Sequence, residues 1–198
     1  VHLKRSLLGK MPGDRWQQFA TLRLLLAYQW TFPGKKLLFM GAELAQPTEW
    51  DFRSPLPWHL LQDPAHAGVQ RVLTDLNRLY VERPCLHRFE FEAGGFRWVD
   101  CDDRDHSLLS FVRQDGDDFV IVVLNFTPVP RHAWRIGVPR AGEYREVFNS
   151  DSAYYGGSNV GNLSGVHAEA TAAHGLPYSV RLTLPPLGAV VLSPTAGS

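Results

Sequence analysis

The chain has 198 residues, of which 44% are hydrophobic, and its 20 basic and 20 acidic residues balance. This composition excludes a disordered chain and a coiled coil. Because neither sign of charge forms a dense run, we expect no nucleic acid and no anionic membrane surface as a partner, and a neutral ligand fits better.

The sequence also bears on the cellular compartment of the protein and on metal binding. No apolar stretch approaches the ~20 residues of a spanning helix, and the N-terminus lacks the order of regions that marks a signal peptide. The only cysteines, Cys85 and Cys101, are too few for a disulfide framework and indicate a reducing compartment. The eight histidines show no two- to four-residue ligand spacing, so we expect no metal and no other cofactor.

The first elements in chain order have an α/β pattern. Apolar residues recur at helical spacing from Gly13 to Phe32, where Asp14 can cap the start and Pro33-Gly34 ends the helix. The run Lys36–Met40 predicts a strand, and it ends in a loop of about twenty residues, which is long for a connection without function. A second helix is predicted from about Pro64 to Glu82.

After about residue 88 the period changes from 3.6 to 2, which places a domain boundary there: 1–88 and 89–198. Seven short strands separated by turn signals predict an antiparallel β-sandwich. The strands are Phe96–Asp100, Leu108–Arg113, Phe119–Phe126, Trp134–Val138, Tyr144–Asn149, Val180–Leu184 and Ala189–Ser193. We expect the sandwich core to contain Phe111, Val120, Val122, Leu124, Leu182, Leu184 and Val191. The stretch 150–165 is predicted to be a long loop.

The first half does not close on itself. A lone, all-apolar strand between two helices needs neighbours for its backbone hydrogen bonds and a cover on both faces. A complete eight-stranded α/β barrel takes about 250 residues. We therefore expect residues 1–88 to be the last helix, strand and helix of a TIM (β/α)8 barrel whose earlier units lie upstream.

Six segments together have a recognisable pattern. They are SLLGKMPGDRWQQFATLRLLLAYQWTFPGKKLLFMGAELAQPTEWDF (6–52), PLPWHLL (55–61), VQRVLTDLNRLY (69–80), LNFTPVPRH (124–132), FNSDSAYYGGSNVGN (148–162) and LTLPPLGAVVL (182–192). With these segments the chain resembles, over nearly its whole length, the C-terminal part of bacterial 1,4-α-glucan (glycogen) branching enzymes of the α-amylase superfamily. The resemblance implies a cytoplasmic enzyme of glycogen biosynthesis, with α-glucan as substrate, that forms α-1,6 branches by a retaining double displacement.

The departure from the family pattern concerns catalysis. Retaining chemistry needs two carboxylates about 5 Å apart, and in the family these lie on earlier barrel strands. The family's His-Asp-Glu motif would stand just before this sequence, which opens Val1-His2-Leu3-Lys4. No catalytic residue is therefore expected in this chain, and the isolated chain is expected to be inactive without the missing N-terminal part.

The candidate site residues lie on the loop after the predicted strand, where barrel sites form. Glu43, Gln46 and Glu49 can hydrogen-bond sugar hydroxyls, and Trp50 can stack on a pyranose ring. The structural alternative is that Glu43 pairs within the fold and Trp50 packs the loop. Glu43 with Glu49, or Glu49 with Asp51, could also be a carboxylate pair, but this spacing in a loop fixes no separation.

Other interpretations stay open. The aromatic residues Tyr154, Tyr155 and Trp134 could form a secondary glucan platform on the β domain, although such residues more often pack a loop. The chain could also be a non-catalytic glucan-binding or scaffold module, or part of another α-amylase superfamily enzyme. The sequence does not give an oligomeric state.

Overall fold

The computed structural model describes residues 4–163 and 165–195. Within them lie two long helices, α1 (Arg15–Thr31) and α2 (Pro64–Glu82), and eight strands. The strands are β1 (Phe96–Asp100), β2 (Leu108–Asp115), β3 (Asp118–Asn125), β4 (Arg131–Val138), β5 (Glu143–Asn149), β6 (Val166–His167), β7 (Tyr178–Leu184) and β8 (Gly188–Pro194). None of the described helices is long and apolar enough to cross a membrane.

Both helices begin and end where local signals predict. Asp14 caps α1 in a reciprocal capping box with Gln17, and Pro33 follows its C-cap. Asp63 caps α2 by accepting a hydrogen bond from the Ala65 amide, and Pro64 occupies the first helical position. The bounds of α2 are those predicted from the sequence.

The strands form two antiparallel sheets. The larger has the order β1-β2-β3-β8-β5-β6 among the described residues, and the smaller pairs β4 with β7. All seven predicted strands are present within a few residues of their predicted ends, and β6 is an additional short strand. The tight turn Asp115–Asp118 joins β2 to β3, with Gly116 at φ +60°.

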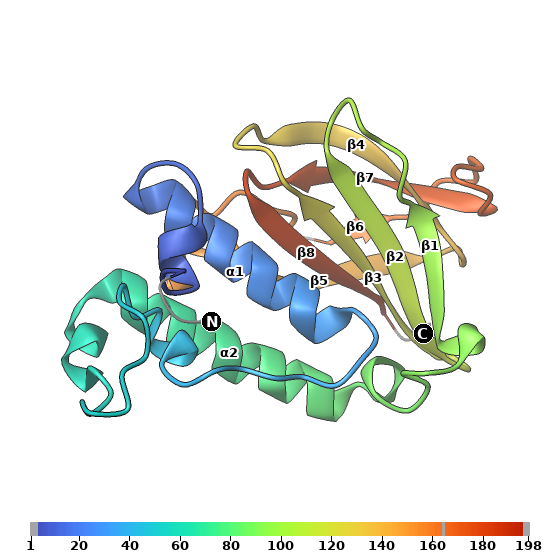
Figure 1. The fold of residues 1–198 in the computed structure, drawn as a ribbon. Coiled ribbons are helices and arrows are strands. Elements are labelled where there is room, and N and C mark those ends of the chain that lie inside the picture. The colour runs from blue at the N-terminus through green and yellow to red at the C-terminus, as the bar shows by residue number, and fades with distance from the viewer. Residues whose placement is uncertain (1–3, 164, 196–198) are drawn as a thin grey trace.

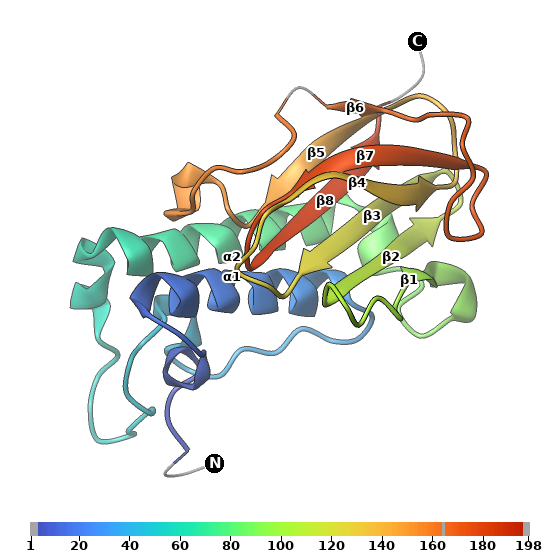
Figure 2. The same ribbon diagram turned by 90° about the horizontal axis from the view of Figure 1, so that it is seen from above.

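Figures 1 and 2 show three layers, with α1 and α2 side by side on one face of the six-stranded sheet and the β4–β7 sheet on the other. One core lies between the two sheets and includes Ile121, Val123, Val190, Val180 and Leu182. A second core lies between the six-stranded sheet and the helices. The central strands are thus buried on both faces.

This arrangement corrects the predicted sandwich core. Leu182 and Leu184 do lie between the sheets, but five other predicted members face the helices: Phe111, Val120, Val122, Leu124 and Val191. The reason is that β3 is apolar on both faces, so alternation along the sequence does not say which face meets the second sheet. The predicted domain boundary near residue 88 is not tested by this packing and stays a prediction.

The strand predicted at Lys36–Met40 is also corrected. The segment is not a strand and runs as an irregular connection from the end of α1 past α2 (Figure 1). A strand needs a neighbour for its backbone groups, and no strand among the described residues pairs with this segment. An apolar run predicts burial, but it cannot supply the partner.

Two cations hydrogen-bond at the C-terminal end of α1, and one of them, Arg113 on β2, joins this end to the sheet. Arg113 is fully buried, and its guanidinium donates to the carbonyl oxygens of Thr31 (2.8 Å), Leu86 (3.0 Å) and Gly95 (3.2 Å). The Lys36 ammonium donates to Phe32 O at 2.6 Å at the C-cap of α1 and to Gly34 O at 2.8 Å. Burial lowers the pKa of Lys36 to about 8, although Glu90 nearby acts in the opposite direction.

Candidate functional site

The turn after the 36–40 segment has an unusual backbone. Gly41 has φ +82° and Ala45 has φ +51°, and between them lies the 3₁₀ turn η2 (Ala42–Leu44). The Gly41 carbonyl accepts from the amides of Leu44 and Gln46, both at 3.2 Å. The Gln46 side chain packs so closely over Gly41 that a Cβ there would lie 2.2 Å from Gln46 Oε1. The positive φ therefore favours glycine at this position, and a Cβ would in addition force the Gln46 amide to move.

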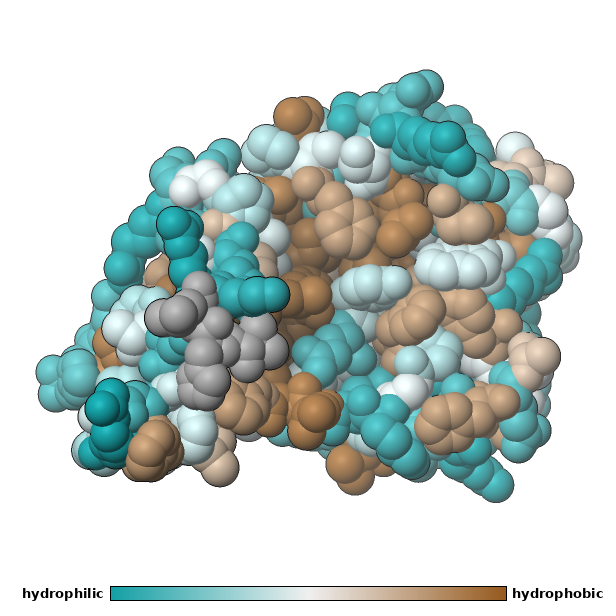
Figure 3. All heavy atoms as spheres, in the orientation of Figure 1, coloured by the Kyte–Doolittle hydropathy of each residue, from teal (hydrophilic) through white to brown (hydrophobic). Residues whose placement is uncertain are grey.

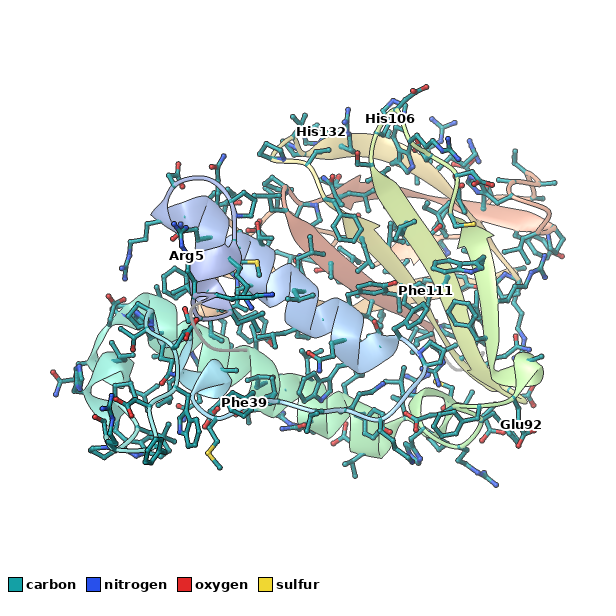
Figure 4. The ribbon with its side chains drawn as sticks, in the orientation of Figure 1. Arg5, Phe39, Glu92, His106, Phe111 and His132 are labelled. Carbon is teal, nitrogen blue, oxygen red and sulfur yellow. The ribbon has the colours of Figure 1, made fainter. Side chains whose placement is uncertain are left out.

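A cleft of about 470 Å³ opens beside this turn. It is bordered by the N-terminal turn around η1 (Leu8–Lys10), the middle of α1, the 37–40 segment and residues 45–50. Arg5 and Phe39, labelled in Figure 4, come from two of these elements. In Figure 3, apolar side chains gather in a hollow on this face beside the N-terminal segment.

Three of the four predicted site residues line the cleft: Gln46, Glu49 and Trp50. Gln46 is buried, whereas Glu49 and Trp50 are half-buried. The Trp50 ring lies edge-on to Phe39 with centroids 5.5 Å apart. Glu43, on η2, is not among the lining residues. The cleft thus offers an amide, a carboxylate and an indole at one rim, together with apolar walls.

The carboxylate pairs considered from the sequence are not assembled here. Neither Glu43 nor Asp51 lines the cleft with Glu49. Asp51 instead binds Arg53 through both carboxylate oxygens, and this hydrogen bonding holds the pKa of Asp51 down at about 2. A carboxylate so strongly ionised is a poor proton donor near neutral pH. Within the described residues, no three His, Cys, Asp or Glu side chains are grouped to hold a metal ion.

Sequence reasoning missed several polar lining residues, of which two have clear structural roles. The Ser6 hydroxyl donates to Pro47 O at 3.0 Å and so ties the N-terminal turn to the loop. The Gln29 amide donates to Leu37 O at 2.6 Å, which holds the 37–40 segment against α1. A glutamine inside an apolar helical stripe was the available signal for Gln29. Ser6 gives no comparable signal, because its partner is 41 residues away.

The loop 150–162 is mainly a structural junction. The buried Asp151 carboxylate accepts hydrogen bonds from the Ser158 amide and hydroxyl and from the Val160 amide. The Tyr155 hydroxyl donates to Asp75 on α2 at 2.6 Å. The loop comes so close to α2 that a Cβ on Gly68 would lie 2.2 Å from Tyr155 O. Only glycine allows this approach.

The aromatic platform considered for the β domain is not assembled. Tyr155 is buried, and Trp134 packs edge-on against His106 with centroids 4.7 Å apart. Tyr154 is exposed, with the Arg71 guanidinium 5.0 Å from its ring centroid. These three rings therefore present no common surface to a sugar.

Comparisons with known proteins agree with the fold and extend it. Residues 98–195 match the family described as "Alpha amylase, C-terminal all-beta domain". The chain is 57% identical over 196 residues to a 1,4-alpha-glucan branching enzyme of Xanthomonas axonopodis pv. citri, covering 98% of this chain and 27% of that protein. Branching enzymes of Thiobacillus denitrificans (57%, 26% of that protein) and Cereibacter sphaeroides (54%, 27%) match over the same share of this chain.

A solved structure is similar as well. The debranching enzyme of Nostoc punctiforme aligns with 98% of this chain and 34% of its own at a TM-score of 0.65 and 18% identity, which supports the fold alone. The chain spans about a quarter of the length of the curated relatives it matches.

Proposed function

We propose that this chain, a homologue of the C-terminal part of bacterial 1,4-alpha-glucan branching enzymes, forms the C-terminal portion of such an enzyme. That enzyme cleaves an α-1,4-glucan and transfers the released segment to a 6-hydroxyl, forming an α-1,6 branch in glycogen. The observation that carries the proposal is the 57% identity over 98% of the chain. The two carboxylates of the retaining double displacement are supplied by the preceding part of the enzyme.

Residues 1–88 complete the catalytic (β/α)8 barrel, and residues 89–198 form the all-β C-terminal domain. The exposed side chains of the 37–40 segment support this: Leu37 is 80% exposed, Phe39 66% and Met40 57%. A monomer rarely leaves so contiguous an apolar run in water. In the complete barrel, neighbouring strands and helices pack on these side chains and give residues 36–40 the hydrogen-bonding partners of a strand.

The cleft rim binds glucan. Gln46 and Glu49 bond sugar hydroxyls, Trp50 offers its face to a pyranose ring, and Glu43 extends the same rim once the barrel is complete. The position of three of these side chains around one cleft supports the assignment. The partners are thus α-glucan and the N-terminal part of the same enzyme, and the place of action is the cytoplasm.

An iodine-staining assay with amylose tests the proposal. The 198-residue chain alone is expected to leave the spectrum unchanged, whereas the same chain joined to its upstream barrel is expected to shift it as branches form. Products should release short chains when a debranching enzyme is added. Branch formation by the isolated chain, or none by the joined protein, would contradict the proposal.

A further inference from the structure

The carbonyl of Leu44 lies at the centre of the turn that carries the cleft residues. Leu44 is fully buried and Ala45 is 2% exposed, so this carbonyl cannot rely on water for a donor. The amides of Leu44, Ala45 and Gln46 all donate to carbonyls of Gly41 and Ala42 within the turn. The donor to Leu44 O comes instead from α2, where His66 Nδ1 lies 2.8 Å away.

We infer that His66 is a positioning residue for the glucan-binding turn, an inference that rests on the function proposed above. A carbonyl oxygen can only accept, so His66 Nδ1 carries the proton. The imidazole is 5% exposed and lies edge-on to Phe19, with centroids 4.9 Å apart and planes at 84°. Its orientation is therefore fixed by packing as well as by the hydrogen bond.

The backbone on either side of Leu44 shows why an anchor is needed. Ala45 adopts the left-handed conformation, which costs free energy for a residue with a Cβ. The next residue is Gln46, whose side chain is wedged against Gly41 and lines the cleft. Without a donor to Leu44 O, the turn can relax toward ordinary backbone angles, and Gln46 then leaves its place at the rim.

The anchor also comes from a rigid element. His66 lies in the first turn of α2, directly after the Asp63 cap and Pro64. Two residues further on, Gly68 is in close contact with the backbone of Tyr155, in the loop 150–162 of the β domain. The His66 hydrogen bond thus attaches the cleft turn to α2, a helix that is itself held by the β domain.

Two substitutions separate the hydrogen bond from the packing. His66→Phe keeps a ring beside Phe19 but removes the donor, and His66→Asn keeps a donor near the position of Nδ1. His59→Phe is the matched control, because His59 is exposed on η3 (Trp58–Gln62). All are made in the enzyme that carries this chain as its C-terminal part, and branching of amylose is measured over a range of substrate concentrations.

The expected result is a split between KM and kcat. In His66→Phe, KM should rise about tenfold with kcat nearly retained, because a misplaced glucan contact weakens binding. His66→Asn and His59→Phe should stay within about twofold of the parent enzyme. A purely structural role would instead lower kcat through loss of folded enzyme at unchanged KM. That outcome, or equal losses in His66→Phe and His66→Asn, would overturn the inference.

Amide hydrogen exchange on the 198-residue chain tests the role of His66 without any assay of branching. It therefore distinguishes a failure of this inference from a failure of the proposed function. Exchange at residues 44–46 should be faster in His66→Phe than in His66→Asn or the parent chain. If the parent enzyme forms no branches but the exchange difference is present, the proposed function is wrong and the anchor stands. Equal exchange in all three proteins would overturn the anchor itself.

Discussion

Removal of the helices should unfold the β domain. In the polypeptide 89–198, the helix-facing side of the six-stranded sheet loses its cover. Phe111, Val120, Val122, Leu124 and Val191 are each fully buried in the whole chain. At about 1.5–3 kcal/mol for each large apolar side chain, their exposure costs about 8–15 kcal/mol, an upper estimate. A domain's whole stability is about 5–15 kcal/mol. We therefore expect no cooperative unfolding of residues 89–198 alone.

Urea denaturation followed by circular dichroism, with a hydrophobic dye and light scattering, measures this. The 198-residue chain should unfold in one cooperative transition, and 89–198 should bind dye, self-associate or lack a transition. Two neighbouring substitutions sharpen the test, because Val122 faces the helices and Val123 faces the second sheet. Both Val122→Thr and Val123→Thr should destabilise the whole chain. A monomeric 89–198 that unfolds cooperatively and is destabilised by Val122→Thr would refute the reasoning.

Two further predictions concern Arg113 and Lys36. Arg113→Met leaves three buried carbonyls without their donor and should lower the free energy of unfolding by about 3 kcal/mol or more in urea titrations. The control Arg97→Met removes an exposed arginine and should cost less than about 1 kcal/mol, and equal costs would contradict the structural role given to Arg113. For Lys36, burial lowers the pKa in the folded chain to about 8 from the usual 10.5. Between these values the unfolded chain binds more protons, so this group's contribution to stability rises with pH. The urea midpoint of the parent chain relative to Lys36→Met should therefore increase between pH 7.5 and 9.5, and a constant difference would show that Lys36 is not desolvated.

Structural features that depend on neighbouring residues could be predicted from the sequence, whereas features that depend on a distant partner could not. The limits of α2 were predictable because the Asp63 cap, Pro64 and the Arg83-Pro84 stop act on neighbouring residues. The strand predicted at Lys36–Met40 does not form in this chain, because an apolar run does not supply a pairing partner. In β3, apolar residues occupy both faces, so the sequence could not tell which face meets the helices.

In the candidate site, too, residues of one segment could be predicted and residues with distant partners could not. Gln46, Glu49 and Trp50 could be predicted as a group because they lie on a single loop, and the structure places them around one cleft. Ser6 and His66 were missed because their partners, Pro47 O and Leu44 O, lie 41 and 22 residues away. Such hydrogen bonds depend on tertiary packing, which no spacing within one segment encodes.

The place of β8 in the sheet bears on how the protein is made. The last strand of the chain lies between β3 and β5, so it supplies the ladder partners of both. During synthesis from the N-terminus, β3 and β5 must wait for β8 before the two halves of the sheet can join. The apolar edges of β3 and β5 therefore stay unpaired until β8 has been synthesised, and a stop codon just before Gly188–Pro194 splits the sheet at its centre. We expect such truncated products to be degraded or to aggregate, whereas loss of β6 at the sheet edge would be far better tolerated.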